Sequence, residues 1–353
     1  MKSKLRFALV GTGAFGAYIG KHIQADPLGA ISCVCDRNLE SAQKAAAEIG
    51  TDVPLLADYE SALGREDVDA VALCTPNFTH AALAIAAAKA GKHIFCEKPM
   101  ANTTADCWSM VEAAEAAGVQ LMVGHKRRLR PPWARLIELA TNGQLGQVVA
   151  INATVFHWDT YGREVSSWWS KKSLAGGLLQ KSCPHVLDAF NAMCAPNCEP
   201  AELVTAVYGP KQEKIFDFSD VMSLTIRYRT GAIASMQSSL HYRLRKYRES
   251  AGTWVQLTHG AIELHSHLDH IDIVYQHVDE VQPHRERFDD LGFETAYTKE
   301  IGDFIRWVLH NDKPCLTWRE GLRTVEVMEA AYRSADSGGV PIHLPLCRER
   351  ETK

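Results

Sequence analysis

The chain has 353 residues, which is more than one hydrophobic core usually supports, so its length predicts two domains. Hydrophobic residues make up 46% of the sequence and charged residues 23%, as in an ordinary soluble globular protein. A formal net charge of -4 gives no overall attraction to nucleic acid or to an anionic membrane, so neither is an expected partner.

Three features predict a cytoplasmic protein. No stretch of the sequence approaches the roughly 18 uninterrupted apolar residues that span a membrane. The apolar stretch that follows residues 1–4 is too short for the core of a signal peptide. The ten cysteines include no Cys-x-x-Cys pair, and several lie within strand-like apolar runs, so we expect reduced thiols in a reducing compartment.

A glycine-rich turn near the N-terminus predicts a dinucleotide site. Leu5–Val10 is an apolar run typical of a buried strand, and a helix is predicted from the end of the turn to about Gln24. The order of strand, GxGxxG turn and helix is the dinucleotide fingerprint, whose glycines let the backbone turn tightly and approach the pyrophosphate closely. The predicted cofactor contacts in this turn are Gly11, Gly13, Ala14, Phe15 and Gly16.

An acidic residue follows the second predicted strand, Ile31–Cys35. Asp36 stands twenty positions after Gly16, where a carboxylate can accept hydrogen bonds from the adenosine ribose and would repel a 2′-phosphate. Asp36 therefore favours NAD over NADP. Two alternatives stay open. Arg37 could stack on adenine or reach a 2′-phosphate, and Asp36 could cap the next helix, although Asn38 is better placed to do so.

The alternation of strands and helices continues to about residue 124. The pattern predicts helices at Leu39–Ile49, His80–Ala90 and Ala105–Ala117, and strands at Ala70–Cys74, His93–Cys96 and Gln120–Val123. This alternation indicates a doubly wound parallel sheet, here a Rossmann domain over residues 1–124. The loop after the third strand is expected to cross the cofactor, although its Asn77 could equally cap a helix. The predicted cofactor contacts of this loop are Thr75, Pro76, Asn77 and His80.

Lys98 is the residue around which we expect the chemistry to be organised. It follows Glu97 at the exit of the apolar run His93–Cys96, and Pro99 ends the strand. Ligands of open α/β sheets bind at the carboxyl ends of the strands, so Glu97 and Lys98 should face the cofactor, and Lys98 also the substrate. The alternative is a solvated ion pair in a strand-to-helix loop.

The second half of the chain is organised differently. Strand-like segments at Val148–Phe156, Glu202–Tyr208, Val221–Tyr228 and Ala232–Ser239 follow one another with few helices between them. This predicts a second α/β domain over residues 125–353, with antiparallel organisation. The last helical stretch, Thr298–Leu309 and Arg319–Ser337, is expected to pack back on the first domain.

Several motifs, in order and at plausible spacing, resemble those of the glucose-fructose oxidoreductase, inositol dehydrogenase and MocA (Gfo/Idh/MocA) family. They are Gly11–Gly16, Thr75-Pro76-Asn77 with His80, Gly91–Pro99, Ala175-Gly176-Gly177 leading to His185–Asp188, Gly321–Arg323 and Ala330–Ala335. The resemblance implies an NAD(P)-dependent dehydrogenase acting on a CH-OH group of a sugar, sugar acid or cyclitol. It also implies a large open C-terminal sheet that joins a homodimer or homotetramer.

His185 is the second residue expected to take part in the chemistry. A loop from Gly176 is predicted to enter a helix with Pro184 at its first position, which puts His185 in the first turn. The positive end of the helix dipole disfavours imidazolium and leaves a neutral imidazole that can accept a hydroxyl proton. Asp188, three residues on, can orient the ring from the same helix face. The alternative is a structural histidine.

The mechanism that the resemblance implies is alcohol oxidation. Hydride leaves a carbinol carbon for the nicotinamide, His185 takes the hydroxyl proton, and Lys98 hydrogen-bonds the same oxygen. Many family members have Asp four residues before this histidine, where the present chain has Lys181. That change favours a second hypothesis, an NAD-dependent glycoside hydrolase that works by transient oxidation and elimination on an anionic glycoside, with Lys181 as a catalytic residue.

Other cations could make the substrate site selective for anions. Lys126 stands where family members commonly carry Asn, and Lys126, Arg128 and Lys181 could converge with Lys98 on one pocket for an acidic sugar. The alternative is that Lys126 and Arg127 face solvent or a cofactor phosphate.

Aromatic residues and histidines complete the set of candidates. Trp158 and Trp168 could stack on a sugar ring, and a packed loop is the alternative. His265, His267 and His270 are expected on an exposed strand edge rather than around a metal, because no nearby cysteine completes a site. The sequence therefore predicts no metal.

Overall fold

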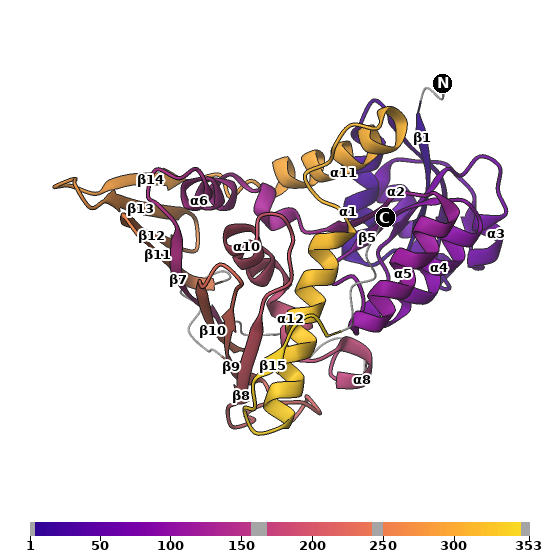
Figure 1. The fold of residues 1–353 in the computed structure, drawn as a ribbon. Coiled ribbons are helices and arrows are strands. Elements are labelled where there is room, and N and C mark those ends of the chain that lie inside the picture. The colour runs from indigo at the N-terminus through magenta and orange to yellow at the C-terminus, as the bar shows by residue number, and fades with distance from the viewer. Residues whose placement is uncertain (1–3, 157–167, 242–249, 347–353) are drawn as a thin grey trace. The chain divides into compact units, whose positions relative to one another are not determined.

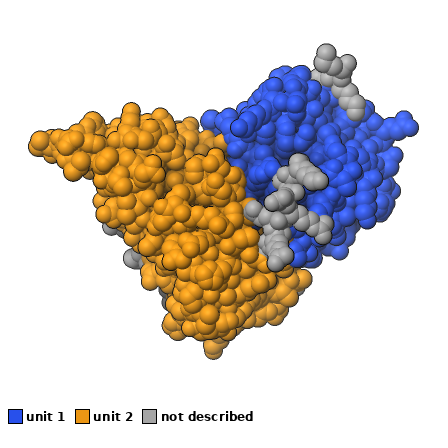
Figure 2. Space-filling view, in the orientation of Figure 1, with its two compact units in different colours: residues 1–101, 105–126, 294–322 blue, residues 102–104, 127–293, 323–353 orange. Residues whose placement is uncertain are grey.

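The computed structural model describes residues 4–156, 168–241 and 250–346, and the chain forms two compact units (Figure 2). The first unit contains residues 1–101, 105–126 and 294–322, and the second contains residues 102–104, 127–293 and 323–353. The sequence-based division between residues 124 and 125 assigns one continuous segment to each domain. In the structure the chain returns to the first unit near its C-terminal end.

The first unit is built on a six-stranded parallel sheet. Its strands have the order β3-β2-β1-β4-β5-β6, which is the order of a dinucleotide-binding Rossmann fold and confirms that prediction. The strands are β1 (Leu5–Val10), β2 (Gly29–Cys35), β3 (Leu55–Leu56), β4 (Ala70–Leu73), β5 (His93–Glu97) and β6 (Leu121–Gly124).

Helices alternate with these strands and cover the sheet. Phe304 of α11 packs its ring 5.9 Å from the rings of both Phe7 on β1 and Phe95 on β5, so a helix distant in sequence covers central strands. The Asn38 side chain caps α2 by accepting hydrogen bonds from the next helical amides, as expected. The helices are α1 (Ala14–Ala25), α2 (Leu39–Ile49), α3 (Tyr59–Leu63), the 3-10 turn η1 (Asn77–Thr79), α4 (His80–Lys89), α5 (Thr104–Ala117) and α11 (Phe293–His310).

The second unit is built on a nine-stranded sheet (Figure 1). Its order is β14-β13-β12-β11-β7-β10-β9-β8-β15, and among the described residues only β7 and β10 pair in parallel, which confirms a large and mainly antiparallel sheet. The sequence pattern predicts no bounds for β11 to β15, although His265, which lies on β12, is expected at an exposed strand edge. The strands are β7 (Val148–Phe156), β8 (Leu203–Tyr208), β9 (Val221–Arg227), β10 (Ile233–Ser239), β11 (Ser250–Leu257), β12 (Gly260–Ser266), β13 (Ile271–His277), β14 (His284–Phe288) and β15 (Ile342–His343).

Helices of the second unit pack against the sheet. The 3-10 turn η2 (Lys126–Leu129) leads into α6 (Pro131–Thr141), which contacts β12 and β13, whereas α9 (Leu178–Ser182) and α10 (Pro184–Cys194) contact β10 and β7. Alternate residues of β9 are buried and exposed, which is typical of a sheet with one covered and one open face.

The segment before α10 is more helical than the sequence suggests. The predicted loop from Gly176 contains α9, and α8 (Lys172–Ala175) precedes it. Gly177 has φ of 106°, and a Cβ there would lie 2.7 Å from the Tyr332 hydroxyl, which accepts a hydrogen bond from the Leu179 amide. Tyr332 belongs to α12 (Trp318–Asp336), whose residues from Arg323 onward lie in the second unit. Only the start of this last helix returns to the first unit.

Within the described ranges, no helix has both the length and the apolar character that crossing a membrane requires.

Candidate functional site

The glycine-rich turn after β1 is shaped by contacts that exclude a side chain. Gly11 has φ of 89°, and a Cβ on it would lie 2.8 Å from the Cys74 backbone and from the Thr75 side chain. A Cβ on Gly16 would lie 2.0 Å from the carbonyl oxygen of Gly11. Both positions therefore require glycine, because the turn packs directly on the end of β4 and on the start of α1.

Gly13 differs because, apart from its neighbours in the chain, a Cβ there would meet no atom of the described residues within 4 Å. It is the N-cap of α1, whose first residue is Ala14, and its own backbone is extended with φ of -61°. The first amides of a helix have no intrahelical acceptor and attract anions. Open space beside these amides fits the pyrophosphate of a dinucleotide. Phe15, in the same turn of helix, is exposed.

Asp36 lies where β2 ends and faces the glycine-rich turn. Its Oδ2 accepts hydrogen bonds from the backbone amide and the hydroxyl of Thr12, at 2.9 Å and 2.8 Å, and its Oδ1 accepts one from the Asn38 amide. Each carboxylate oxygen can accept more than one hydrogen bond, so ribose hydroxyls can still bind. Arg37 is exposed next to it. Sequence analysis missed Thr12, which holds the carboxylate in place.

His80 links two of the predicted cofactor loops from inside the fold. Its ring nitrogens lie 2.9 Å from the Thr75 carbonyl oxygen and 3.0 Å from the Pro99 carbonyl oxygen, and the side chain is only 1% exposed. Burial lowers the pKa of His80, while the two carbonyl oxygens act in the opposite direction. This geometry indicates that His80 holds the Thr75 and Pro99 segments together, and its direct contact with the cofactor stays a prediction.

The rest of that loop is held by short hydrogen bonds. The Thr75 and Thr79 hydroxyls lie 2.7 Å apart, and Thr79 donates to the Pro76 carbonyl oxygen. Asn77 begins η1 and is buried. The loop therefore has a defined conformation at the carboxyl end of β4, beside the glycine-rich turn.

Glu97 and Lys126 form a buried pair at the ends of β5 and β6. The Lys126 Nζ lies 3.8 Å from Glu97 Oε1 and 4.3 Å from the centre of the Tyr297 ring, and it is 5.3 Å from the Phe15 ring. The Lys126 charge is thus compensated within the first unit. Burial raises the pKa of the Tyr297 hydroxyl. Tyr297 comes from α11, and no motif marks it in the sequence.

Lys98 directly follows Glu97 and is partly buried. Its backbone amide donates a hydrogen bond of 3.1 Å to Glu97 Oε2. The structure therefore puts Lys98 at the carboxyl edge of the parallel sheet, as the strand pattern indicates.

His185 and Asp188 lie on α10 in the second unit. Pro184 occupies the first position of this helix, as predicted, so His185 lies in the first turn, where it is 9% exposed. The fully buried carboxylate of Asp188 accepts hydrogen bonds from Arg128, with Nε to Oδ2 at 2.8 Å and Nη2 to Oδ1 at 2.5 Å. Arg128 is therefore paired with a carboxylate, which reduces its value for binding an anionic substrate.

The Lys181 side chain lies among aromatic rings. Its Nζ lies 4.2 Å from the ring centre of Phe216 and 4.7 Å from that of Trp169, with the Phe218 ring farther away at 6.0 Å. Trp168 packs edge-on against Trp169, at 4.8 Å between ring centres. Cation–π attraction stabilises a desolvated ammonium in such a site. Trp158, the other predicted sugar-stacking residue, lies outside the described residues.

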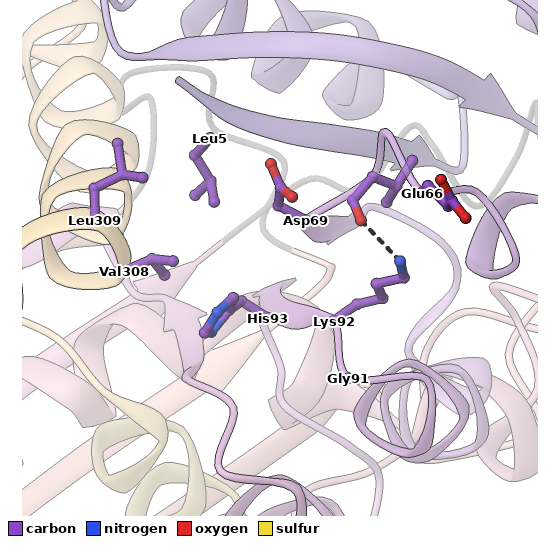
Figure 3. Close-up of a pocket in the computed structure, with 9 residues that line it drawn as sticks. Leu5, Glu66, Asp69, Gly91, Lys92, His93, Val308 and Leu309 are labelled. Carbon is purple, nitrogen blue, oxygen red and sulfur yellow. Dashed lines mark hydrogen bonds between the residues drawn. The ribbon is translucent and has the colours of Figure 1, made fainter. Parts of the chain in front are cut away.

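A pocket on the first unit lies away from these residues (Figure 3). Leu5 and His93, which line it, are the first residues of β1 and β5, so it is at the amino edge of the sheet. Lys92 there donates hydrogen bonds to the carbonyl oxygens of Val68 and Arg65. The glycine-rich turn follows the last residue of β1 at the opposite edge, so this pocket is not the dinucleotide site.

Comparison with known protein families agrees with this geometry. Residues 5–125 match the oxidoreductase family described as having an NAD-binding Rossmann fold, and residues 137–344 match the C-terminal α/β domain of the same Gfo/Idh/MocA family. The chain belongs to this family. It is therefore an NAD-binding oxidoreductase, and the glycine-rich turn with Asp36 fits that cofactor.

Individual relatives of this family member include several dehydrogenases. It is 30% identical to 4-carboxy-2-hydroxymuconate-6-semialdehyde dehydrogenase from Sphingobium sp. over 261 residues. The matched region covers 71% of this chain and 78% of the relative. It is 28% identical over 326 residues to levoglucosan dehydrogenase from Pseudarthrobacter phenanthrenivorans, covering 83% and 80%. The WlbA dehydrogenase from Bordetella pertussis, solved with NADH and UDP-GlcNAcA, has a TM-score of 0.81 and 25% identity over 98% of this chain and 100% of that one.

The open space at Gly13 leads to a prediction about NAD binding. Gly13→Ala should leave the free energy of unfolding unchanged or raise it by about 0.4–1 kcal/mol, because alanine fits this backbone. The same methyl group should weaken NAD binding by about tenfold or more, since it occupies the space of the pyrophosphate. Fluorescence titration with NAD and thermal unfolding measure the two effects. Gly64→Ala is the matched control, because Gly64 also has an ordinary φ and a Cβ there would lie at a normal contact distance of 3.5 Å from the Glu60 carbonyl oxygen. Unchanged NAD affinity in Gly13→Ala contradicts the assignment.

The Arg128–Asp188 pair leads to a prediction about stability. Arg128→Met should lower the free energy of unfolding by about 3–5 kcal/mol, because it removes the arginine that forms a two-pronged ion pair with a buried carboxylate. Adding Asp188→Asn should restore part of that loss. Arg227→Met is the control, since Arg227 makes the same two-pronged contact with Glu202 at the surface, where the expected loss is about 1 kcal/mol or less. Denaturant unfolding measures all three. Equal losses of unfolding free energy in Arg128→Met and Arg227→Met would show that burial does not strengthen the Arg128–Asp188 ion pair.

Proposed function

We propose that this protein is an NAD-dependent dehydrogenase that oxidises a secondary alcohol of a sugar, sugar acid or cyclitol. The observation that carries the proposal is the glycine-rich turn, with open space at Gly13 and the Asp36 carboxylate held by Thr12. The levoglucosan and inositol dehydrogenases among its relatives support the choice of substrate class.

Lys98 and His185 have complementary roles in this proposal. Bound NAD supplies the nicotinamide ring, which accepts the hydride. Lys98 Nζ donates a hydrogen bond to the substrate oxygen and stabilises the negative charge that develops on it. A ring nitrogen of His185 accepts the hydroxyl proton. Lys98 belongs to the first unit and His185 to the second.

Asp36 supports a preference for NAD over NADP. Its carboxylate is fixed by three hydrogen bonds beside the glycine-rich turn, and a 2′-phosphate would bring negative charge next to it. Arg37 is exposed and is the residue that could counter this preference.

Lys181 supports an acidic or otherwise anionic substrate. The other two candidate cations of the second half are less available, since Lys126 is paired with Glu97 and Arg128 with Asp188. The Lys181 Nζ lies against the rings of Phe216 and Trp169 and donates a hydrogen bond of 3.4 Å to the Trp169 carbonyl oxygen, so a cationic group is held in place here. One relative is named for a substrate that carries a carboxy group.

The open face of the nine-stranded sheet supports association of identical chains. Val207, Ile233 and Trp254 are 50%, 45% and 39% exposed, and their strand neighbours Ala206, Ala234 and Val255 are buried on the other face. Exposed apolar side chains on one face favour association, so we expect a homodimer or homotetramer.

Trp254→Glu should shift the mass measured by light scattering toward that of the monomer. Gln237→Glu, on the same face, is the control and should shift the mass less. A wild-type monomer contradicts this expectation.

Absorbance at 340 nm tests the proposed activity. Purified protein with NAD should accumulate NADH with at least one member of a panel of neutral sugars, cyclitols, uronates, sulfosugars and their glycosides. Product analysis on the same samples separates the alternatives. Glycoside cleavage without net NADH would identify a redox-assisted glycoside hydrolase, and absence of both reactions across the panel would contradict the substrate class.

Lys98→Met should reduce turnover by about 10²–10³ and leave NAD affinity nearly unchanged, because it removes only a donor to the substrate oxygen. Steady-state kinetics and NAD titration measure the two effects. Lys89→Met, an exposed lysine in the last turn of α4, is the control and should retain full activity. Undiminished turnover in Lys98→Met would remove this residue from the mechanism.

Lys181→Met should lower the ratio of kcat/KM for anionic over neutral substrates by about tenfold to a hundredfold, because it removes a charge and retains an apolar chain within the aromatic surrounding. Lys181→Arg should keep most of the preference. If the ratio is the same in wild type and Lys181→Met, Lys181 does not bind the anion.

A further inference from the structure

Two histidines and an aspartate meet at the end of the β12–β13 hairpin. His267 and His270 bracket its turn, where the His267 amide donates to the His270 carbonyl oxygen at 2.9 Å, and Asp272 follows on β13. Asp272 is the cross-strand partner of His265. The residues that alternate with them, Ser266, Ile271 and Ile273, are buried. The side chains of His267, His270 and Asp272 therefore share the open face of the sheet.

The potential ligand atoms are separated by distances close to those of a metal site. Asp272 Oδ2 lies 3.7 Å from His267 Nε2 and 3.8 Å from His270 Nε2, and the three ligand atoms all lie within 4.8 Å of one another. Ligands about 2.0–2.1 Å from a tetrahedral zinc ion are about 3.4 Å apart. The His267 and His270 rings are stacked, with centres 4.2 Å apart and planes 15° apart, so both partly exposed rings must turn for their Nε2 lone pairs to converge on one ion.

A further carboxylate orients one of the two rings. His270 Nδ1 lies 2.7 Å from Asp269 Oδ1, which indicates that Nδ1 carries the proton. In the neutral ring, Nε2 then presents its lone pair toward Asp272. A carboxylate that holds the far nitrogen of a histidine ligand is a recurrent feature of metal sites. It fixes the tautomer and makes the ligand nitrogen more basic.

A cation fits at the centre of the arrangement. The Nε2 atoms of His267 and His270 lie 3.7 Å and 3.8 Å from the same oxygen of Asp272, beyond hydrogen-bond length, so a metal ion between them would contact all three groups. Arg285 supplies one cation, with Nη1 at 3.6 Å from Asp272 Oδ2, but its side chain is 67% exposed and can move away. His265 is not part of the set, because its Nε2 contacts Glu263 Oε2 at 2.7 Å.

We propose that His267, His270 and Asp272 bind a divalent transition metal ion, with Zn²⁺ as the preferred occupant. Two imidazoles and one carboxylate are a ligand set that suits zinc, and the exposure of His267 leaves room for water at the remaining position. The ion would tie the turn of the hairpin to β13. The sequence predicts no metal here because no cysteine is near these histidines, whereas the register of the hairpin brings in Asp272 as the third ligand.

A competition experiment, in which the protein and a chromophoric chelator compete for Zn²⁺, tests the site. The protein should be full-length, carry no histidine tag and be treated with EDTA beforehand. Wild type should bind one Zn²⁺. The double variant His267→Gln, His270→Gln should bind Zn²⁺ with an affinity that is lower by about a hundredfold or more. Asp269→Asn should weaken binding by about tenfold, through the orientation of His270. Arg285→Gln should strengthen it, because a competing cation is removed. His284→Gln is the control and should bind as wild type does, because His284 lies on β14 of the same sheet and likewise contacts a carboxylate, that of Glu280 in the preceding turn.

Co²⁺ absorption gives a second readout. Wild-type protein should show the visible bands of a four-coordinate Co²⁺ site, and Asp272→Asn should lose them while its circular dichroism stays that of the folded chain. Zn²⁺ binding that is equal in wild type and the double variant overturns the proposal. Absence of wild-type binding at micromolar Zn²⁺ does so as well, and would leave the residues as an ion-pair cluster around Asp272.

Discussion

The parallel register of β1, β2, β4 and β5 is the constraint on which the first unit depends. Parallel strands end at the same edge of a sheet, so the residues that follow them become neighbours although they are far apart in sequence. At this edge the glycine-rich turn packs so closely on Cys74 and Thr75 that a Cβ on Gly11 has no room. The same edge receives Asp36 and Lys98, and His80 ties the Thr75 and Pro99 backbones together beneath it.

Buried cations are compensated in three different ways in this protein. Lys126 lies beside the Glu97 carboxylate and the Tyr297 ring, Arg128 forms a two-pronged ion pair with Asp188, and Lys181 lies against aromatic faces. A carboxylate neutralises a cation, whereas an aromatic face only lowers its desolvation cost. Lys126 and Arg128 each link two segments of their own unit through a carboxylate, whereas Lys181 packs among aromatic rings of the second unit.

The open face of the nine-stranded sheet brings together two kinds of surface chemistry. Exposed apolar side chains such as Trp254 and Ile233 favour contact with another chain, while the β12–β13 hairpin gathers histidines around one carboxylate. Both depend on strand alternation, which directs every second side chain to the uncovered face. The helices α6, α9 and α10 pack on the sheet and bury the alternate residues.

The sequence by itself determined the fold class, the glycine-rich turn, Asp36, the position of Pro184 in its helix and Asn38 as a cap, because each is encoded by residues close together in the chain. Tertiary structure decided the partners: Thr12 for Asp36, Tyr297 for Lys126, Arg128 for Asp188, and Phe216 with Phe218 for Lys181. It also decided that α11 covers the first sheet and that Asp272 joins His267 and His270. These contacts join segments whose sequence spacing carries no periodic signal, so only the packing of helices and the register of strands could bring them together.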